Sequence, residues 1–213
     1  SDTLSGKDMA SALGADIAVE NGVWRVTGRG VKPSGETIDV GNSGTSLYFG
    51  MAAAALSDRP VTFTGDEQIC RRSAAPLLSA LESLGVKVES SNGCTPLTVT
   101  GPIKGGTCEV KAVTSQYLSA LLLACPLAEN ETVIEVPLLN EKPYVEMTLA
   151  WLDRCGIRYE NHGFTRFVIP GKQSYKPFDA SVPADFSSAA FFLVAGGISD
   201  KGILLEGLDY TDT

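Results

Sequence analysis

A chain of 213 residues with a formal net charge of −8 lacks the basic excess with which proteins hold nucleic-acid phosphates, and this argues against a nucleic-acid-binding protein. Its 44% hydrophobic and 20% charged residues are typical of a globular protein with a substantial core. The apolar run from Tyr117 to Ala128 is too short to span a membrane, and we expect no membrane partner.

Residues that commonly hold metals or carry redox chemistry are few. The five cysteines are odd in number and lack the C-x-x-C spacing of zinc or redox sites, which favours reduced thiols in a cytoplasmic protein. The one histidine, His162, lies in the turn-like stretch ENHGF, which argues against a Ser–His triad and a histidine metal site. We therefore expect neither a metal nor a cofactor.

In chain order, the predicted elements repeat. A helix that ends in glycine and continues into two strands occurs three times, and the terminal glycines are Gly14, Gly85 and Gly156. Both spacings are 71 residues (85 − 14 and 156 − 85). Because glycine readily adopts the left-handed conformation after the last helical turn, the recurrence indicates one repeated way of ending a helix.

A second pattern alternates with the first and consists of a strand, a small polar cluster, an apolar helix and another strand. The strand valines Val40, Val110 and Val182 are 70 and 72 residues apart, and the clusters lie at 43–46, 114–116 and 187–188. Together the patterns predict an α/β fold of three βαβαββ units around a pseudo-threefold axis. We expect the apolar helices inside and amphipathic ones, such as 75–84, outside.

The segment VTSQYLSALLLACPLA, from Val113 to Ala128, combines a polar cluster with an apolar helix. Thr114 and Ser115 are favourable helix N-caps, and capping would explain one such cluster. Hydroxyls at a helix N-terminus also suit a bound anion, since the free N–H groups and the helix dipole favour negative charge. Because all three apolar helices begin this way, we favour an anion site where their N-termini meet.

Five motifs follow the order and nearly the spacing of one known family. They are GNSGTS (41–46), TGDEQICRR (64–72), VTSQYLSALLLACPLA (113–128), EKPYVEMTLAWL (141–152) and ADFSSAAFFLVAG (184–196). On these motifs, across essentially its whole length, the chain resembles the 5-enolpyruvylshikimate-3-phosphate (EPSP) synthases, or 3-phosphoshikimate 1-carboxyvinyltransferases. The resemblance implies an inverse α/β barrel fold, with two domains of three βαβαββ units and an active site between them.

The resemblance also implies which part of the family fold is present. The family's Lys-Ser-x-Ser-Asn-Arg segment would precede Ser1, and its crossing into the other domain falls near 182–185. Residues 1–178 are therefore expected to be the first large domain without its N-terminal segment, and residues 179–213 the start of the second. The tail from Phe178 to Gly207 repeats the unit pattern, so it either folds back to complete the third unit or lies outside it.

The family reaction joins phosphoenolpyruvate to shikimate 3-phosphate in the shikimate pathway of aromatic amino acid biosynthesis. The resemblance implies that these small anions, and the inhibitor glyphosate that competes with phosphoenolpyruvate, are the ligands. The residues implied for shikimate 3-phosphate are Thr114, Ser115, Gln116 and Tyr144, and those implied for phosphoenolpyruvate or glyphosate are Gly44, Arg72 and Gln116. The family's proton-transfer residues belong to the second domain, so no catalytic residue is expected here. We expect a substrate-binding portion, inactive alone, whose partner is the missing second domain of the parent protein.

Two positions depart from the family pattern. Tyr48 stands where many members have arginine, which removes a positive charge near the site. Glu141 stands where bacterial members often have a phosphate-binding serine. A carboxylate that faces the phosphate would repel it, so either Glu141 turns away and Lys142 compensates, or phosphate binding is weakened.

Two other functions remain open at this point. A UDP-N-acetylglucosamine enolpyruvyl transferase would carry a reactive cysteine five positions before the phosphate-binding arginine, where this chain has Glu67. A non-catalytic anion-binding module would fold and bind its ligand without chemistry.

Overall fold

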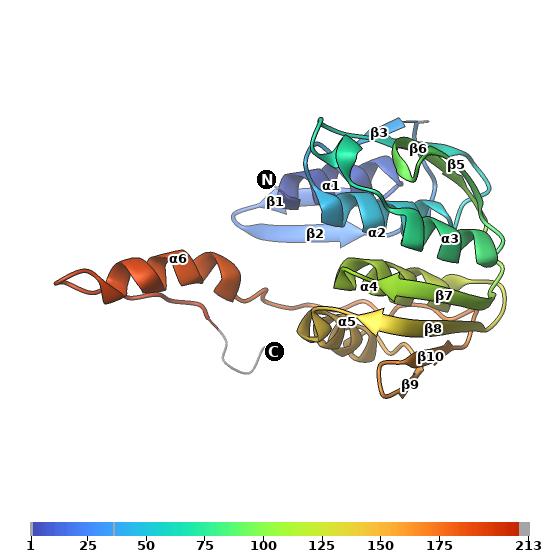
Figure 1. Cartoon of the computed structure of the whole chain (residues 1–213). Helices are drawn as coiled ribbons and strands as arrows, with labels where there is room; N and C mark the ends of the chain where they lie inside the picture. The colour runs from blue at the N-terminus through green and yellow to red at the C-terminus, as the bar shows by residue number, and fades with distance from the viewer. Residues whose placement is uncertain (1, 36, 209–213) are drawn as a thin grey trace. The chain divides into compact units, whose positions relative to one another are not determined.

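The computed structural model describes residues 2–35 and 37–208 and divides the chain into two compact units (Figure 1). The first unit ends at Tyr175 and the second begins at Lys176. Among the described residues, the helices of the first unit are α1 (Asp2–Ala12), α2 (Gly44–Ala54), α3 (Ala75–Ser83), α4 (Ser115–Ala124) and α5 (Lys142–Arg154). Two short 3₁₀ helices accompany them, η1 (Ile69–Arg71) and η2 (Cys125–Leu127).

The strands of the first unit form a hairpin and two four-stranded sheets. The hairpin consists of β1 (Asp16–Glu20) and β2 (Val23–Thr27). One sheet has the order β3-β4-β6-β5 and contains β3 (Thr37–Asp39), β4 (Val61–Thr64), β5 (Lys87–Ser91) and β6 (Cys94–Thr100). The other has the order β7-β8-β10-β9 and contains β7 (Gly106–Ala112), β8 (Thr132–Leu139), β9 (Glu160–His162) and β10 (Arg166–Ile169).

The two four-stranded sheets have the same topology. In each, the first two strands are parallel and joined by a buried helix. The last strand in sequence, β6 or β10, pairs antiparallel with the second of them, and the outer strand, β5 or β9, pairs antiparallel with that last strand. Residues 37–100 and 106–169 are thus two complete βαβαββ units, as the sequence repeat predicts. The segment α1-β1-β2 supplies the last three elements of a third.

The three repeated glycines all have positive φ, at 105° for Gly14, 91° for Gly85 and 74° for Gly156. In each case the residue after the glycine donates its N–H to the carbonyl five positions earlier, over 2.9–3.1 Å. The glycine itself donates to the carbonyl three positions earlier, over 3.0 Å. This arrangement satisfies carbonyls at the helix end and requires the left-handed residue that the repeat predicts.

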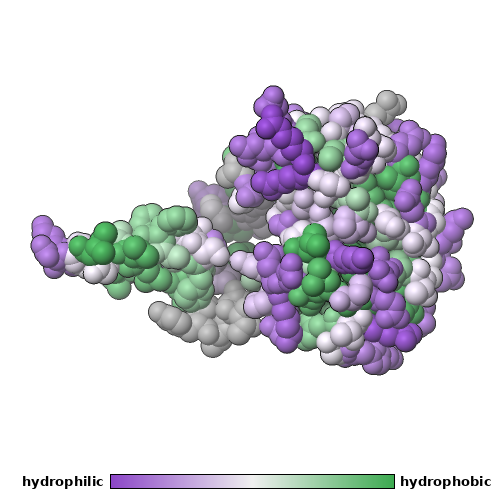
Figure 2. Space-filling model, viewed as in Figure 1, coloured by the Kyte–Doolittle hydropathy of each residue, from purple (hydrophilic) through white to green (hydrophobic). Residues whose placement is uncertain are grey.

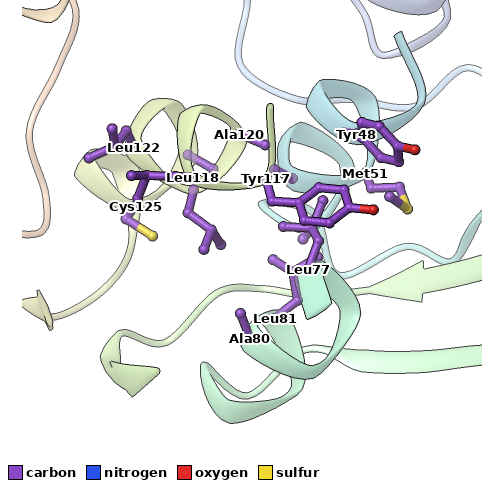
Figure 3. Close-up of a cluster of buried hydrophobic side chains, with 14 of the residues drawn as sticks. Tyr48, Met51, Leu77, Ala80, Leu81, Tyr117, Leu118, Ala120, Leu122 and Cys125 are labelled. Atoms are coloured by element: carbon purple, nitrogen blue, oxygen red, sulfur yellow. The ribbon is translucent and has the colours of Figure 1, made fainter. Parts of the chain in front are cut away.

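Helices α2 and α4 are buried on nearly all sides and pack against each other. Figure 3 shows their apolar side chains, among them Met51 and Leu118, in one cluster with Leu77 and Leu81 of α3. Helix α3 buries one face and exposes the other, and it packs on β7. The expected interior and exterior positions of these helices are confirmed, and the shared core fixes where the N-termini of α2 and α4 lie.

The second unit contains α6 (Phe186–Gly197), the third apolar helix that the sequence predicts. Its apolar side chains are exposed in the described structure, with Phe191 at 80% and Phe192 at 57%, and the helix surface is largely green in Figure 2. The strand predicted around Val182 is also absent from residues 176–208. A strand needs hydrogen-bonded neighbours, and within those residues the one backbone link across the unit is Ala184 N–H to the Gly207 carbonyl, at 2.9 Å.

Candidate functional site

The N-terminus of α4 presents side-chain hydroxyls and backbone amides together. Strand β7 ends at Ala112, and Thr114 takes an extended conformation (φ −128°, ψ 142°) as the N-cap. Its Oγ1 accepts a long hydrogen bond of 3.5 Å from Gln116 N–H. Ser115 begins the helix and is buried, because the apolar face behind it packs into the core. The sequence therefore places an anion-favouring helix end beside a small set of polar side chains.

A pocket of about 540 Å³ opens at this helix end, lined by side chains of α2, α4 and α5. Four predicted site residues line it, namely Thr114, Ser115, Gln116 and Tyr144. Tyr144 is 51% exposed and comes from the first turn of α5. The other residues that line the pocket are Thr45, Phe49, Ser119, Leu123, Glu141, Met147, Thr148 and Trp151.

Gln116 connects this pocket to the N-terminus of α2. Its Nε2 donates to Thr45 Oγ1 over 2.8 Å. A Cβ placed on Gly44 would lie 3.6 Å from Gln116 Oε1 and 3.4 Å from Arg72 Nη1. The three residues predicted for phosphoenolpyruvate therefore lie together, next to the residues predicted for shikimate 3-phosphate.

The α2 end also has the geometry of an open helix N-terminus. Ser43 is the N-cap, and its Oγ accepts from Ser46 N–H over 3.2 Å. Asn42 Nδ2 donates a hydrogen bond of 2.8 Å to Gln68 Oε1, which links the two adjoining loops. The backbone of Gly44 faces Arg72 without an intervening Cβ, so a ligand oxygen can approach both.

Arg72 and its neighbour Arg71 have different surroundings. Arg71 pairs with Glu67, Nη2 to Oε2, over 3.2 Å. Arg72 has no ion-pair partner among residues 2–35 and 37–208, and it is exposed. A guanidinium without a carboxylate partner is available to an anion that approaches the helix ends.

Glu141 occupies the helix end that the sequence assigns to a phosphate. Its Oε2 accepts from Ser115 N–H at 3.3 Å, Ser115 Oγ–H at 3.1 Å and Thr114 Oγ1–H at 3.4 Å. The alternative in which Glu141 turns away is wrong for this structure. Lys142 does not compensate either, since its Nζ pairs with Glu146 at 3.1 Å and lies 4.3 Å from the centre of the Phe164 ring.

Tyr48 replaces the expected positive charge with aromatic packing. Its ring is buried and meets Tyr117 edge-on, with ring centres 4.9 Å apart and planes at 88° (Figure 3). Tyr117 Oη in turn donates to the Ser73 carbonyl at 2.8 Å, one residue after Arg72. Burial, with a smaller contribution from Tyr48, raises the pKa of Tyr117, so the Tyr117 hydroxyl stays neutral.

Sequence reasoning missed the polar side chains along the pocket wall. Ser119 and Thr148 join α4 to α5 through a 2.7 Å hydroxyl–hydroxyl bond, and Thr148 also donates to the Tyr144 carbonyl at 2.9 Å. A signal existed, because Ser119 follows Ser115 by one helical turn inside an otherwise apolar run. These contacts join α4 to α5 along the pocket wall.

A second hollow of about 380 Å³ is lined mainly by apolar side chains of α1, α2 and α4 and by residues 28–31. Arg29 is the one charged residue among the described residues of its lining, and it lies 4.0 Å from the Asp16 carboxylate. In the part of the chain that the structure describes, no cluster of three His, Cys, Asp or Glu side chains has metal-site geometry. None of the described helices has the length and apolar character needed to cross a bilayer. The pocket at the α4 N-terminus is therefore the candidate site.

Comparison with known proteins gives one result along the whole chain. The family model described as EPSP synthase (3-phosphoshikimate 1-carboxyvinyltransferase) matches residues 1–213. A 3-phosphoshikimate 1-carboxyvinyltransferase of Acetivibrio thermocellus is 47% identical over 99% of this chain and 51% of its own length. One of Methanococcoides burtonii is 40% identical over 97% of this chain and 50% of its own length. The chain thus spans about half the length of the curated relatives it matches.

A solved structure agrees with the sequence relatives. An EPSP synthase from Acinetobacter baumannii superposes with a TM-score of 0.79 at 25% identity, over 97% of this chain and 48% of that one. The first unit therefore has the fold of an EPSP synthase, as the family resemblance implied, and its βαβαββ units agree with the sequence repeat.

Proposed function

Because the chain belongs to the EPSP synthase family, we propose that it is the portion of an enolpyruvyl transferase that holds shikimate 3-phosphate and phosphoenolpyruvate. The observation that carries this proposal is the junction at Gln116, which joins the hydroxyl-bearing end of α4 to the glycine end of α2. Two anions bound side by side need two separate sets of donors. The two helix ends supply them.

Shikimate 3-phosphate lies in the pocket between α4 and α5. Its phosphate is held by Ser115 N–H and by the hydroxyls of Ser115 and Thr114, at the positive end of the α4 dipole. Tyr144 packs against the shikimate ring. Gln116, whose amide already spans the two helices, contacts both substrates.

Phosphoenolpyruvate lies at the N-terminus of α2. Its phosphate accepts from the guanidinium of Arg72 and from the backbone beside Gly44, where the missing Cβ permits close approach. Glyphosate, as a competing anion, would use the same donors. In the transfer, the 5-hydroxyl of shikimate 3-phosphate adds to C2 of the enol phosphate while C3 gains a proton. The C2–O bond to phosphate then breaks as C3 loses a proton, which leaves the enol ether product, so holding the two substrates at fixed positions lowers the barrier.

Residues 1–178 are proposed as the first large domain of this family and residues 179–213 as the start of the second. The groups that move protons are assigned to the second domain of a longer, cytoplasmic parent protein. That second domain is the proposed partner of this chain. The chain alone is therefore expected to bind substrate without turnover. Mixing it with both substrates should release no phosphate above the rate without protein.

Binding is tested by an amide NMR titration with shikimate 3-phosphate, followed by phosphoenolpyruvate. We expect the first ligand to shift Ser115, Gln116 and Tyr144, and the second to shift Gly44. Ser115→Ala should weaken shikimate 3-phosphate by about tenfold or more, since a hydrogen bond to a charged group is lost. Ser188→Ala, which removes a hydroxyl from the first turn of α6, is the matched control and should leave affinity unchanged. Shifts confined to other surfaces would refute the proposal.

A further inference from the structure

Glu141 has an unusual backbone conformation and serves a neighbouring helix. It has φ 58° and ψ 44°, the left-handed region that residues with a side chain seldom adopt. Glu141 precedes α5, yet its carboxylate makes no side-chain capping bond to that helix. All three of its hydrogen bonds go to Thr114 and Ser115 at the start of α4.

The preceding residue fixes this geometry. Asn140 N–H donates to the Ala112 carbonyl at 3.0 Å, and Asn140 Nδ2 donates to the Val113 carbonyl at 3.2 Å. The loop before α5 is therefore tied to the loop before α4. With the loops joined, the left-handed turn at Glu141 directs its carboxylate onto the α4 helix end.

The carboxylate takes the donors that an oxyanion ligand needs. A phosphate oxygen at the α4 end and Glu141 Oε2 would compete for the same N–H and the same two hydroxyls. Two negative charges at hydrogen-bond separation also repel each other, most strongly where solvent is partly excluded. The nearest cation in sequence, Lys142, is paired with Glu146 and does not offset this repulsion.

The carboxylate is nonetheless held by long bonds. Its three contacts measure 3.1–3.4 Å, whereas charge-assisted bonds to a carboxylate are about 2.5–2.9 Å. A phosphate monoester has about two charges and three acceptor oxygens, so it forms the stronger set of contacts at the same helix end. Side-chain rotation of Glu141 is enough to vacate the donors, with no change in the tied loops.

We propose that Glu141 is an internal anion that occupies the phosphate position of the empty site and must be displaced by the substrate phosphate. The identity of the substrate in this proposal rests on the proposed function. The competition between Glu141 and a phosphate for the donors of α4 does not depend on it. The consequence is selectivity. Singly charged carboxylates and free inorganic phosphate bind poorly, because they gain too few contacts to displace Glu141, whereas a phosphate on a ring that also contacts Tyr144 displaces it.

The test compares inorganic phosphate binding to the full chain and to three variants by NMR titration. Glu141→Gln keeps the shape and removes the charge, so it should bind inorganic phosphate about tenfold more tightly, which corresponds to about 1.4 kcal/mol. Glu141→Ser, which adds a small hydroxyl donor, should tighten binding at least as much. Glu82→Gln removes the same charge from an exposed position on α3, away from this helix end, and should change affinity by less than about twofold.

The proposal is overturned if both Glu141 variants bind inorganic phosphate no more tightly than the unchanged chain, or if Glu82→Gln tightens it equally. Shikimate 3-phosphate separates the two proposals. If the Glu141 variants gain phosphate affinity while no form of the chain binds shikimate 3-phosphate, the displaced anion stands and the proposed function fails. If the unchanged chain binds shikimate 3-phosphate at Ser115 and the variants gain nothing, the proposed function stands and the displaced anion fails.

Discussion

Arg71 and Arg72 carry the same charge on adjacent residues, and the structure gives them different partners. Arg71 is paired with Glu67 in an exposed contact, while the Arg72 guanidinium lies beside Gly44. We expect Arg72→Ala to weaken phosphoenolpyruvate binding by about tenfold or more, since a charge-assisted phosphate contact is lost. Arg71→Ala should leave binding within about twofold. Calorimetric titration of phosphoenolpyruvate into the shikimate 3-phosphate complex measures both, and equal losses would contradict the assignment.

A substitution at Gly44 can distinguish a role in ligand binding from a role in packing. An added Cβ would lie 3.4 Å from Arg72 Nη1 and from Tyr48 Cε2, which are ordinary van der Waals contacts. Alanine also favours a helix by up to about 1 kcal/mol over glycine in a helix interior. Gly44→Ala should therefore keep or raise the melting temperature while it weakens phosphoenolpyruvate binding. A fall of several degrees, seen by circular dichroism, would show that the glycine is required for packing.

Side-chain direction is what sequence reasoning could not supply at this scale. The family resemblance identified Tyr48 and Glu141 as departures, but not where they point. Tyr48 is directed into the core by its edge-on contact with Tyr117. Glu141 is directed onto α4 by its left-handed backbone conformation, which the sequence does not predict because the residue is not a glycine. Both outcomes depend on contacts between residues far apart in the chain.

At the scale of the element, the buried helices support the site. Leu118 is fully buried in α4, where it packs in the cluster of Figure 3. Leu118→Ala should cost about 2–5 kcal/mol in the free energy of unfolding, because a large cavity is left. Leu4→Ala, at a position 56% exposed in α1, should cost under about 1 kcal/mol. Urea denaturation measures both, and similar losses would show that α4 is not a core helix.

Helix α6 has a pH-sensitive start. The pKa of Asp185 is held below its ordinary value by the Ser188 hydroxyl and by the amides of Ser188 and Ser187. Because the folded pKa is the lower one, this stabilisation is complete above the ordinary pKa of an aspartate. It is lost as the pH falls through the lowered value. Amide exchange at Ser187 and Ser188 should accelerate in acid beyond its intrinsic pH dependence, and Asp185→Ala should abolish that difference. Identical profiles in both forms would contradict the cap.

The helix ends were the most predictable elements. A glycine every 71 residues predicted the left-handed helix terminations, since few other residues adopt that conformation at low cost. The helix N-termini at Ser43 and Thr114 followed equally well from capping chemistry. The surroundings of α6 did not follow, because an apolar sequence shows a preference for burial and does not identify the surface that would provide it.

At the scale of the whole molecule, the cysteines report the integrity of the core. Cys108, Cys125 and Cys155 are buried, whereas Cys70 and Cys94 are partly exposed. Burial raises the pKa of the Cys108 thiol to about 12, and it raises the pKa of Cys125 as well, so neither forms much thiolate at pH 8. Iodoacetamide at that pH should label Cys70 and Cys94 in the folded chain and all five after denaturation. Mass spectrometry that finds Cys108 or Cys125 labelled in the folded chain would contradict this core.

The repeat made the architecture of the first unit predictable, because one βαβαββ pattern read twice gives two sheets of the same topology. It also brought the site residues together, since equivalent helix ends of repeated units lie at the same end of the domain. The pocket shape, the hydroxyl pair of Ser119 and Thr148 and the position of Glu141 arise from packing between α4 and α5. Such packing has no local sequence signal.

The most direct test of the account is a crystal structure of this chain with shikimate 3-phosphate. The account predicts phosphate oxygens within about 3 Å of Ser115 N and Oγ, the shikimate ring beside Tyr144, and the Glu141 carboxylate rotated away from α4. A ligand bound elsewhere on the molecule, with Glu141 still hydrogen-bonded to Thr114 and Ser115, would contradict it.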